Sequence, residues 1–279
     1  MQVERGEFYL PDTIVKQVKK KLNDLSLNDL PDYLTIVPDG EPTLDVHLDE
    51  LITKLKDFGF PVAVISNSSL IDDAEVQSEL IKANYISLKV DTVNQSSWKS
   101  INKPHKMLNL GSILSAIQQF SMVYKGKLVT ETMLIQGAND NEEELVALAN
   151  YLQCVNPDIA YIAIPTRPPA FKGTFAANEL AVARAYNIFI QHGLSTELLT
   201  GYEGNAFASS GNFAEDVLSI TAVHPMRQDA VMQLMANSNT SEKSLNLLID
   251  KGLIEKISYN KQEYFLRTFS NNKNNKRCI

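Results

Sequence analysis

Apolar positions along the first 200 residues follow two alternating periods. Short runs rich in β-branched and aromatic residues alternate with longer segments in which apolar side chains recur at helical spacing. The short runs predict strands at residues 33–37, 61–66, 85–90, 128–135, 159–164 and 196–199. The longer segments predict helices at residues 48–58, 72–81, 112–124, 141–155 and 178–192. Strands that alternate with amphipathic helices indicate parallel βαβ units.

The connections between these elements are short, which favours a partial (β/α)₆ barrel. An open, doubly wound sheet is the alternative. No GxGxxG sequence follows any of the predicted strands, so the chain lacks the fingerprint of a dinucleotide-binding Rossmann fold. We therefore assign residues 1–200 to an α/β domain of the barrel type.

A different pattern begins after residue 200. Residues 201–213 are rich in glycine and serine and have no periodicity, which is typical of a linker. Residues 214–269 predict three short helices followed by a β-hairpin, an order typical of a winged-helix domain. Residues 270–279 are polar and basic, and we expect them to be disordered. The predicted helices are 214–223, 227–235 and 241–251, and the strands are 253–257 and 263–266.

The charge of the chain is uneven. The net charge is −7, but residues 216–279 carry nine Lys and Arg against six Asp and Glu, a net of +3. The predicted recognition helix of the winged helix offers Lys243, Asn246 and Lys251. This basic footprint is small for a dedicated DNA-binding domain, so we expect no sequence-specific DNA binding. Packing against the barrel, dimerisation or docking of a substrate fits the composition better.

Neither end of the chain nor its middle carries a membrane signal. The N-terminus has no apolar segment of the kind found in secretory signals, and no apolar run approaches the length of a membrane span. These features predict a cytoplasmic protein that does not associate with membranes.

Cys154 and Cys278 are the only two cysteines. Two distant thiols make neither a disulfide framework nor a CxxC-type metal site. Cys154 lies in an apolar helical segment, which predicts a side chain packed in the core. The four histidines also lack the spacing of metal ligands.

Polar residues gather where the predicted strands end. In parallel α/β barrels the active site lies at the carboxyl ends of the strands. Small, polar and charged side chains should therefore converge on one rim and suit a ligand that carries both signs of charge. These residues are Asp39, Gly40, Glu41, Pro42, Asn67, Ser87, Lys89, Asp91, Glu131, Met133 and Arg167.

The turn after the first predicted strand has a defined chemistry. Gly40 would allow a ligand to approach the backbone, Glu41 offers a carboxylate to an ammonium group, and Pro42 fixes the turn. An ordinary βα turn with an exposed glutamate is the alternative.

Two further residues are candidates for contact with a substrate. His105 follows Pro104 at a predicted rim position. Arg167 lies in a rigid, proline-rich segment and could bind a phosphate or carboxylate with two hydrogen bonds. A surface salt bridge is the alternative for Arg167.

Residues 33–71, YLTIVPDGEPTLDVHLDELITKLKDFGFPVAVISNSSLI, resemble the core of radical S-adenosylmethionine (radical SAM) proteins. The similarity is closer to the branch of Fe–S oxidoreductases related to wyosine-type tRNA-modifying enzymes. Further matching segments are ERGEFYLP, SLKVDTV, INKPH, ETMLIQGAND and PTRPPA, in the order of the family. A C-terminal winged helix also occurs in that branch.

The resemblance implies a partial (β/α)₆ barrel that binds S-adenosylmethionine. Asp39, Gly40 and Glu41 would occupy the place of the family's Gly-Gly-Glu, which receives the methionine ammonium; Asp39 departs from the usual glycine. Asn67, Ser87, Lys89 and Asp91 would lie near the ribose or the substrate. Glu131 and Met133 would line the pocket. The implied substrate is not identified, and an RNA base or a protein would both be compatible.

The resemblance also implies a [4Fe–4S] cluster, for which the family uses a CxxxCxxC loop after the first barrel strand. This sequence contains no such motif, and Cys154 and Cys278 lack its spacing. We therefore expect the barrel to lack its first strand, and we expect no reductive cleavage of S-adenosylmethionine by this chain alone. Two hypotheses follow: a radical SAM protein without its cluster ligands, or a non-catalytic barrel that binds a small ligand and interacts through its winged helix.

Overall fold

The computed structural model describes residues 2–26, 30–37, 40–169, 171, 173–201, 209, 211–223, 225–259 and 261–268. The chain forms two compact units. One comprises residues 1–18 and 31–201, and the other comprises residues 19–30 and 202–279. Residues 19–30 are thus grouped with the C-terminal residues, although the sequence placed them with the first domain. The division at residue 201 lies where the linker was predicted.

The first unit is an α/β structure with a six-stranded parallel sheet. Its strands are β1 (Leu34–Ile36), β2 (Val62–Ser66), β3 (Tyr85–Lys89), β4 (Lys127–Met133), β5 (Ile159–Ala163) and β6 (Thr196–Leu199). They lie side by side in the order of the sequence, as the strand–helix alternation predicted. β1 and β6 are the end strands, so the sheet has the form of an open, partial barrel.

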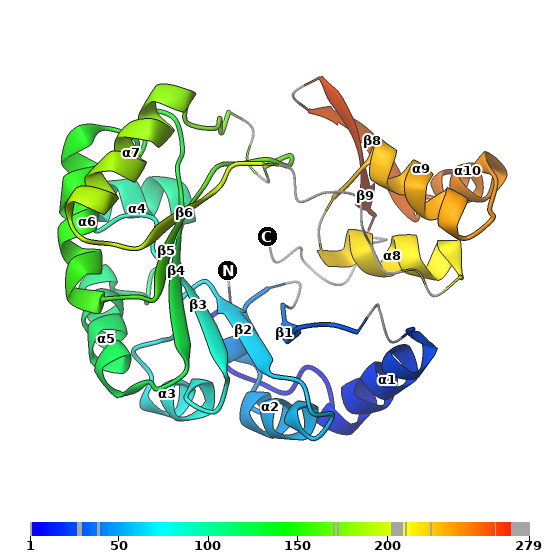
Figure 1. Cartoon of the computed structure of the whole chain (residues 1–279), viewed down its shortest axis with the longest axis horizontal. Helices are drawn as coiled ribbons and strands as arrows, with labels where there is room; N and C mark the ends of the chain where they lie inside the picture. The colour runs from blue at the N-terminus through cyan, green and yellow to red at the C-terminus, as the bar shows by residue number, and fades with distance from the viewer. Residues whose placement is uncertain are drawn as a thin grey trace. The chain divides into compact units, whose positions relative to one another are not determined.

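Helices cover one side of this sheet (Figure 1). They are α2 (Leu48–Lys56), α3 (Ala74–Leu80), α4 (Gln95–Asn102), α5 (Leu110–Val123), α6 (Glu142–Val155) and α7 (Glu179–Gln191). A short 3-10 helix, η2 (Pro42–Leu44), precedes α2. Leu128 of β4 and Ile162 of β5 are buried against the helices, whereas Lys127 and Glu131, on the other face of β4, are accessible.

The sequence missed two helices of the chain. α1 (Pro11–Asp24) begins with proline at its first position, a favoured place for this residue. α4 has few apolar residues; its start is fixed by Asn94, whose side chain accepts hydrogen bonds from the amides of Ser96 and Ser97. Both helices contain few apolar residues, so the apolar pattern did not single them out, although those of α1 recur at helical spacing.

The prediction that Cys154 packs in the core is wrong, because this residue is exposed. The buried face of α6 includes Leu145, Leu148, Leu152 and Val155. Cys154 follows Leu152 by two positions, which in a helix points its side chain to the opposite side.

The second unit combines three helices with a small antiparallel sheet. The helices are α8 (Phe213–Val223), α9 (Gln228–Asn237) and α10 (Glu242–Asp250), and the strands are β7 (Met226–Arg227), β8 (Ile254–Tyr259) and β9 (Gln262–Arg267). The strand order is β7-β9-β8. The three predicted helices and the hairpin are thus confirmed, with β7 in addition. A separate apolar core, which includes Val217, Leu234 and Phe265, holds this unit together.

No helix among the described residues is both long and apolar enough to cross a membrane. The predicted disordered tail, residues 270–279, lies outside the described part of the chain.

Candidate functional site

The carboxyl ends of β1, β2 and β3 bring three of the predicted site residues close together. Glu41 follows β1, Asn67 follows β2, and Lys89 is the last residue of β3. The strands are parallel and adjacent, so their carboxyl ends share one edge of the sheet. This edge is the candidate functional site.

The carboxylate of Glu41 is held by hydrogen bonds from other residues of the protein. Its carboxylate accepts hydrogen bonds at Oε1 from the amide of Thr43 (3.2 Å), the hydroxyl of Thr43 (2.8 Å) and the hydroxyl of Ser66 (2.7 Å), and at Oε2 from the amide of Asn67 (2.6 Å). The residue is buried, not exposed as an ordinary turn would have it. Burial raises the pKa of Glu41, and the hydrogen bonds oppose this without cancelling it.

These contacts define what Glu41 can do for a ligand. A carboxylate has about four acceptor positions, two on each oxygen. Three of the hydrogen bonds are accepted by Oε1, so this oxygen has no position left for a ligand. An ammonium group could therefore be received only at Oε2. The main result of the contacts is to tie the turn after β1 to the end of β2.

The residues on either side of Glu41 differ in what the structure shows. Pro42 is the first residue of η2 and is buried. A side chain added at Gly40 would meet no atom within 4 Å, so there is open space beside its Cα. Asp39 lies outside the described residues.

Lys89, Asp91 and Glu131 form a charged cluster at the same edge. The ammonium of Lys89 lies 3.3 Å from Oδ1 of Asp91 and 3.7 Å from Oε1 of Glu131. Lys89 and Glu131 are direct neighbours across β3 and β4. Burial alone would lower the pKa of Lys89, but the two carboxylates outweigh it and the pKa is raised. Lys89 therefore stays charged at neutral pH.

Asp91 also holds the backbone of this edge. Its Oδ1 accepts from the amide of Met133 (2.9 Å), and its Oδ2 accepts from the side-chain amide of Asn102 (2.7 Å). Met133 thus joins the cluster through its backbone. Ser87 lies two residues before Lys89 on the same face of β3, is buried, and is opposite Val129 of β4.

A pocket of about 200 Å³ adjoins the cluster. Three of the predicted residues, Asn67, Lys89 and Asp91, belong to its polar side. Apart from Asn102, the residues that line it from α4, from the segment that follows α4, and from α5 carry largely apolar side chains.

His105 and Arg167, which were predicted to contact a substrate, do not line this pocket. Nδ1 of His105 accepts a long hydrogen bond of 3.4 Å from the amide of Met107, within its own turn. Arg167 lies in the segment after β5 and is partly buried.

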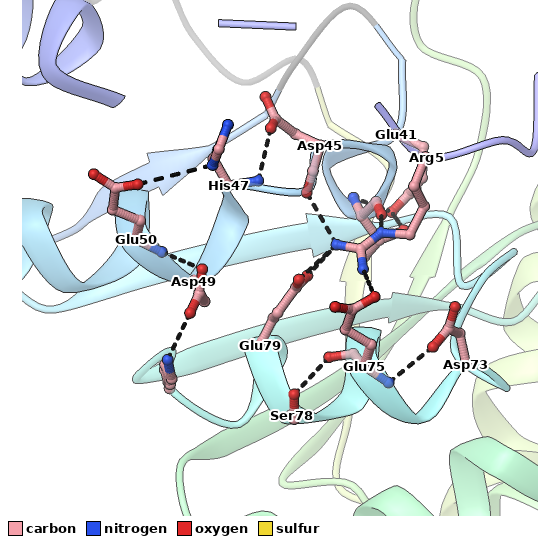
Figure 2. A network of polar contacts seen from close by, with 12 residues as sticks. Arg5, Glu41, Asp45, His47, Asp49, Glu50, Asp73, Glu75, Ser78 and Glu79 are labelled. Atoms are coloured by element: carbon pink, nitrogen blue, oxygen red, sulfur yellow. Dashed lines mark hydrogen bonds and ion pairs between the residues drawn. The ribbon is translucent and has the colours of Figure 1, made fainter. Parts of the chain in front are cut away.

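Arg5 is a residue of structural consequence that the sequence did not single out. Figure 2 shows its guanidinium directed at Glu75 and Glu79 of α3 and at the backbone after Glu41. It donates to both carboxylate oxygens of Glu79 (2.6 and 2.5 Å) and to Glu75 (2.9 Å). It also donates to the carbonyls of Thr43 (3.0 Å) and Asp45 (3.1 Å).

These contacts anchor the N-terminal segment beside the site. The amide of Gly6 donates to the carbonyl of Leu44, and the amide of Val46 donates to the carbonyl of Gly6. The only hint in the sequence was that Arg5 lies in ERGEFYLP, one of the segments that match the radical SAM family.

The residues of this chain do not fit a [4Fe–4S] cluster. Such a cluster is held by three or four thiolates, and the sequence has two cysteines. Cys154 is exposed on α6, and Cys278 lies outside the described residues. The described ranges also contain no group of three or more His, Cys, Asp or Glu side chains that could hold a metal ion.

This chain has relatives in archaea and bacteria. A UPF0026 protein of Methanocaldococcus jannaschii is 37% identical over 275 residues, 98% of this chain and 85% of the relative. A UPF0026 protein of Helicobacter pylori is 33% identical over 173 residues, 61% of this chain and 55% of that protein. The aligned region thus spans about half of the Helicobacter protein's length. No protein-family model matches the chain.

The fold is shared with solved radical SAM enzymes. A radical SAM methyltransferase from Sphaerobacter thermophilus aligns with a TM-score of 0.52 at 15% identity, over 70% of this chain and 59% of the methyltransferase. SuiB of Streptococcus suis, bound to S-adenosylmethionine, aligns with a TM-score of 0.50 at 14% identity, over 76% of this chain and 50% of SuiB. At these identities the likeness concerns the fold.

Proposed function

This chain belongs to the UPF0026 family, and on that premise we propose that it is a radical SAM protein whose barrel binds S-adenosylmethionine. The parent activity is hydrogen abstraction by a 5′-deoxyadenosyl radical from a substrate, and an RNA base and a protein both remain open as that substrate. We further propose that the chain by itself does not perform this reaction, because its two cysteines do not provide the cluster ligands.

The observation that carries the proposal is the charged cluster at the edge of a sheet whose fold is shared with radical SAM enzymes. S-adenosylmethionine carries an ammonium, a sulfonium and a carboxylate. Lys89 would hold the carboxylate or a ribose hydroxyl, and Glu131 and Asp91 would balance the cationic groups. The distances of 3.3 and 3.7 Å in the cluster leave the ammonium of Lys89 able to turn toward a ligand.

A further part of the site fits the proposal. Gly40 has open space beside its Cα, where the methionine end could approach the backbone. Asn67 would stay in place near the ribose, since its amide is held by Glu41. These residues bind and orient the ligand; radical formation would need thiolates from outside this chain.

Isothermal titration of the purified chain with S-adenosylmethionine tests the proposal. We expect saturable binding, and we expect Lys89→Met to weaken it by about ten-fold, the value of one charge-assisted hydrogen bond. Lys99→Met, on the exposed surface of α4, is the matched control and should bind like the wild type. Absence of saturable binding to the folded wild type would rule the proposal out.

Iron analysis tests the claim that the chain alone lacks the cluster. After anaerobic reconstitution with iron and sulfide, we expect no stoichiometric iron and no cluster absorbance. A stoichiometric cluster on the purified chain would overturn this part of the proposal while leaving S-adenosylmethionine binding intact.

The second candidate function is a non-catalytic barrel that binds a small ligand and acts through its C-terminal unit. The observation in its favour is that this unit has its own core and the helix and hairpin order of a winged helix. An electrophoretic shift of DNA that responds to a nucleoside ligand would favour this function. A shift that is absent with and without the ligand would count against it.

A further inference from the structure

The outward face of α7 is apolar, unlike that of the helix beside it. On the side away from the sheet, Leu180 and Ile190 are 77% and 45% exposed, and Ala183 is exposed as well. The exposed residues of the neighbouring α6 are mostly polar and include Glu143 and Asn150. A helix that is apolar on all sides is normally buried on all sides. The buried face of α7 consists of Ala181, Val182, Ala185, Ile188 and Phe189.

The exposed apolar residues of α7 recur at the spacing of a helix–helix contact. Leu180, Ala183, Asn187 and Ile190 follow one another at intervals of three, four and three residues, which places them in one line along the helix. We call these four residues the α7 stripe. None of them is charged, and only Asn187 is polar. An uncharged line on the outer face of a surface helix indicates a contact with another helix.

The edge of the sheet extends this surface. β6 is an end strand, and Leu198 lies opposite Ile162 of β5. Residues opposite each other on adjacent strands share one face of a sheet, so Leu198 lies on the helical side, as Ile162 does. Ile162 is buried, whereas Leu198 is 43% exposed. Tyr186 of α7, which is 36% exposed, adds an aromatic ring beside the stripe.

The order of residues in the stripe fits a second copy of the same chain. Positions 180 and 190 are equally distant from position 185, and so are positions 183 and 187. If two copies of α7 pack antiparallel about a two-fold axis at the level of residue 185, Leu180 of one copy meets Ile190 of the other. Ala183 then meets Asn187. The same patch serves on both copies, which is the condition for a closed two-fold interface.

The size of the surface sets the strength of such a contact. α7 has 13 residues, so it is about 20 Å long. Two helices of this length, with the adjoining edges of β6, bury on the order of 1,000 Å² in total, at the low end for specific interfaces. This area suits a reversible dimer with a Kd in the micromolar range.

We propose that α7 is the contact surface of a homodimer in which the α7 stripes of two copies pack antiparallel about a two-fold axis. The small side chain of Ala183 lets the helices approach and leaves room for Asn187 of the other copy. A polar residue at such a position fixes the register of the helices. The contact lies on the helical side of the sheet and involves neither the charged cluster nor S-adenosylmethionine.

Sedimentation velocity of the full chain, from about 1 to about 200 µM, measures the dimer across the range expected for an interface of this size. We expect a monomer–dimer equilibrium that strengthens as salt rises, because each copy carries a net charge of −7 and salt screens the repulsion. Leu180→Glu should raise the Kd by at least about fifty-fold, since it places two unpaired carboxylates in an apolar contact.

Two matched variants serve as controls. Met122→Glu alters a residue of α5 that is 72% exposed, and Leu247→Glu alters a residue of α10 that is 50% exposed. Both should dimerise like the wild type. Leu180 and Ile190 are themselves exposed, so we expect their variants to fold, which circular dichroism checks.

A charge pair tests the register. Ile190→Lys alone should also weaken the dimer. The double variant Leu180→Glu/Ile190→Lys should return the Kd to within about ten-fold of the wild type, because each introduced carboxylate meets an introduced ammonium of the other copy. The two positions are ten residues apart on one helix, so they cannot pair within a single copy.

Four results would overturn the proposal. They are a wild type that stays monomeric at every concentration, a dimer that survives Leu180→Glu, a dimer lost equally in Leu247→Glu, and a double variant that is not restored. The third would move the contact to the second unit, and the fourth would reject the antiparallel register. Because no step requires S-adenosylmethionine, these outcomes are independent of the proposed function.

Discussion

At the scale of single residues, the most consequential contact that the structure adds is the ion pair between Arg5 and Glu79. The side chains are 11% and 7% exposed, so both charges are largely removed from water. Such a pair is costly to break, because the remaining partner is left as an uncompensated buried charge. Arg5 also supplies donors to two backbone carbonyls beside Glu41.

We predict that Arg5→Met lowers the free energy of unfolding of the first unit by about 3–5 kcal/mol. Arg5→Lys should fall between the wild type and Arg5→Met, since lysine keeps the charge but not the planar set of donors. Glu75→Gln is the control; its side chain is 73% exposed, and we expect a loss below about 1 kcal/mol. Urea unfolding followed by Trp98 fluorescence measures all three. Equal losses for Arg5→Met and Glu75→Gln would contradict the burial argument.

Glu41 gives the site a pH dependence. Burial raises the pKa of Glu41 in the folded state above its value in the unfolded chain. The folded state therefore binds the proton more tightly. Its contribution to stability is fully present below the unfolded pKa and is lost as the pH rises through the folded pKa.

We therefore predict that the wild type loses stability relative to Glu41→Gln as the pH rises from the acidic range toward neutrality. The difference in unfolding free energy should fall by about 1.4 kcal/mol for each unit by which the pKa is raised. Glu79, whose pKa is also raised, contributes to both proteins and cancels in the difference. Urea unfolding of the wild type and Glu41→Gln over this pH range measures the difference in unfolding free energy. A difference that grows with pH would refute the raised pKa of Glu41.

At the scale of elements, the start of α6 fastens the segment that follows β3. The carboxylate of Glu144 accepts hydrogen bonds from the hydroxyls of Thr92 and Ser97, both at 2.6 Å. Asn141 caps the same helix by accepting from the amide of Glu144. Acidic residues in the first turn of a helix are favoured by its dipole, and here Glu144 also anchors a loop at the candidate site.

Glu144→Ala should cost about 2–4 kcal/mol, because it leaves two hydroxyls without a charged acceptor. Glu143→Ala, one residue earlier and exposed, should be within about 0.5 kcal/mol of the wild type. Hydrogen exchange should show faster exchange in residues 92–97 of Glu144→Ala alone. Unchanged exchange there would show that Glu144 does not hold this segment.

Segments rich in apolar residues were predicted well, and helices with few apolar residues were missed. The six strands and α2, α3, α5, α6 and α7 appear where the pattern indicated, because each has one buried face with a regular spacing. α1 and α4 were missed because they contain few apolar residues; α1 begins at Pro11, and Asn94 caps α4.

At the scale of the whole molecule, the chain has two separate hydrophobic cores. One is built on the parallel sheet and includes Phe120; the other includes Phe265 and lies in the second unit. Separate cores are the physical basis for units that unfold separately. Trp98 belongs to the first core, so its fluorescence reports on the first unit.

We predict that Phe265→Ala lowers the stability of the second unit by about 3–5 kcal/mol without moving the transition seen by Trp98. Phe120→Ala, an equally buried substitution in the first core, should move the Trp98 transition by a similar amount. Far-ultraviolet circular dichroism, measured on the same samples, follows the loss of helix in both units and so includes the unfolding of the second unit. If Phe265→Ala shifts the Trp98 transition as much as Phe120→Ala does, the two units unfold as one.

The sequence by itself determined the alternation of strands and helices, the boundary near residue 201, and a set of polar residues at strand ends. It did so because a strand's or helix's apolar spacing is a local property, and parallel strands bring their carboxyl ends to one edge whatever else the fold contains. The resemblance to radical SAM proteins rested on the same local segments. Asn67, Lys89 and Asp91 are therefore found together as expected.

Only the tertiary structure decided which of these groups are available to a ligand. Glu41 is saturated at Oε1 by contacts with Thr43 and Ser66, of which Ser66 lies 25 positions away in the sequence. No local pattern indicates that Arg5 pairs with Glu79 or that Cys154 is exposed. The same holds for the buried oxygens of Ser68 and Asn102 that have no hydrogen-bond partner. Burial and hydrogen-bond partners arise from contacts between distant segments, and so they become visible only once the chain is folded.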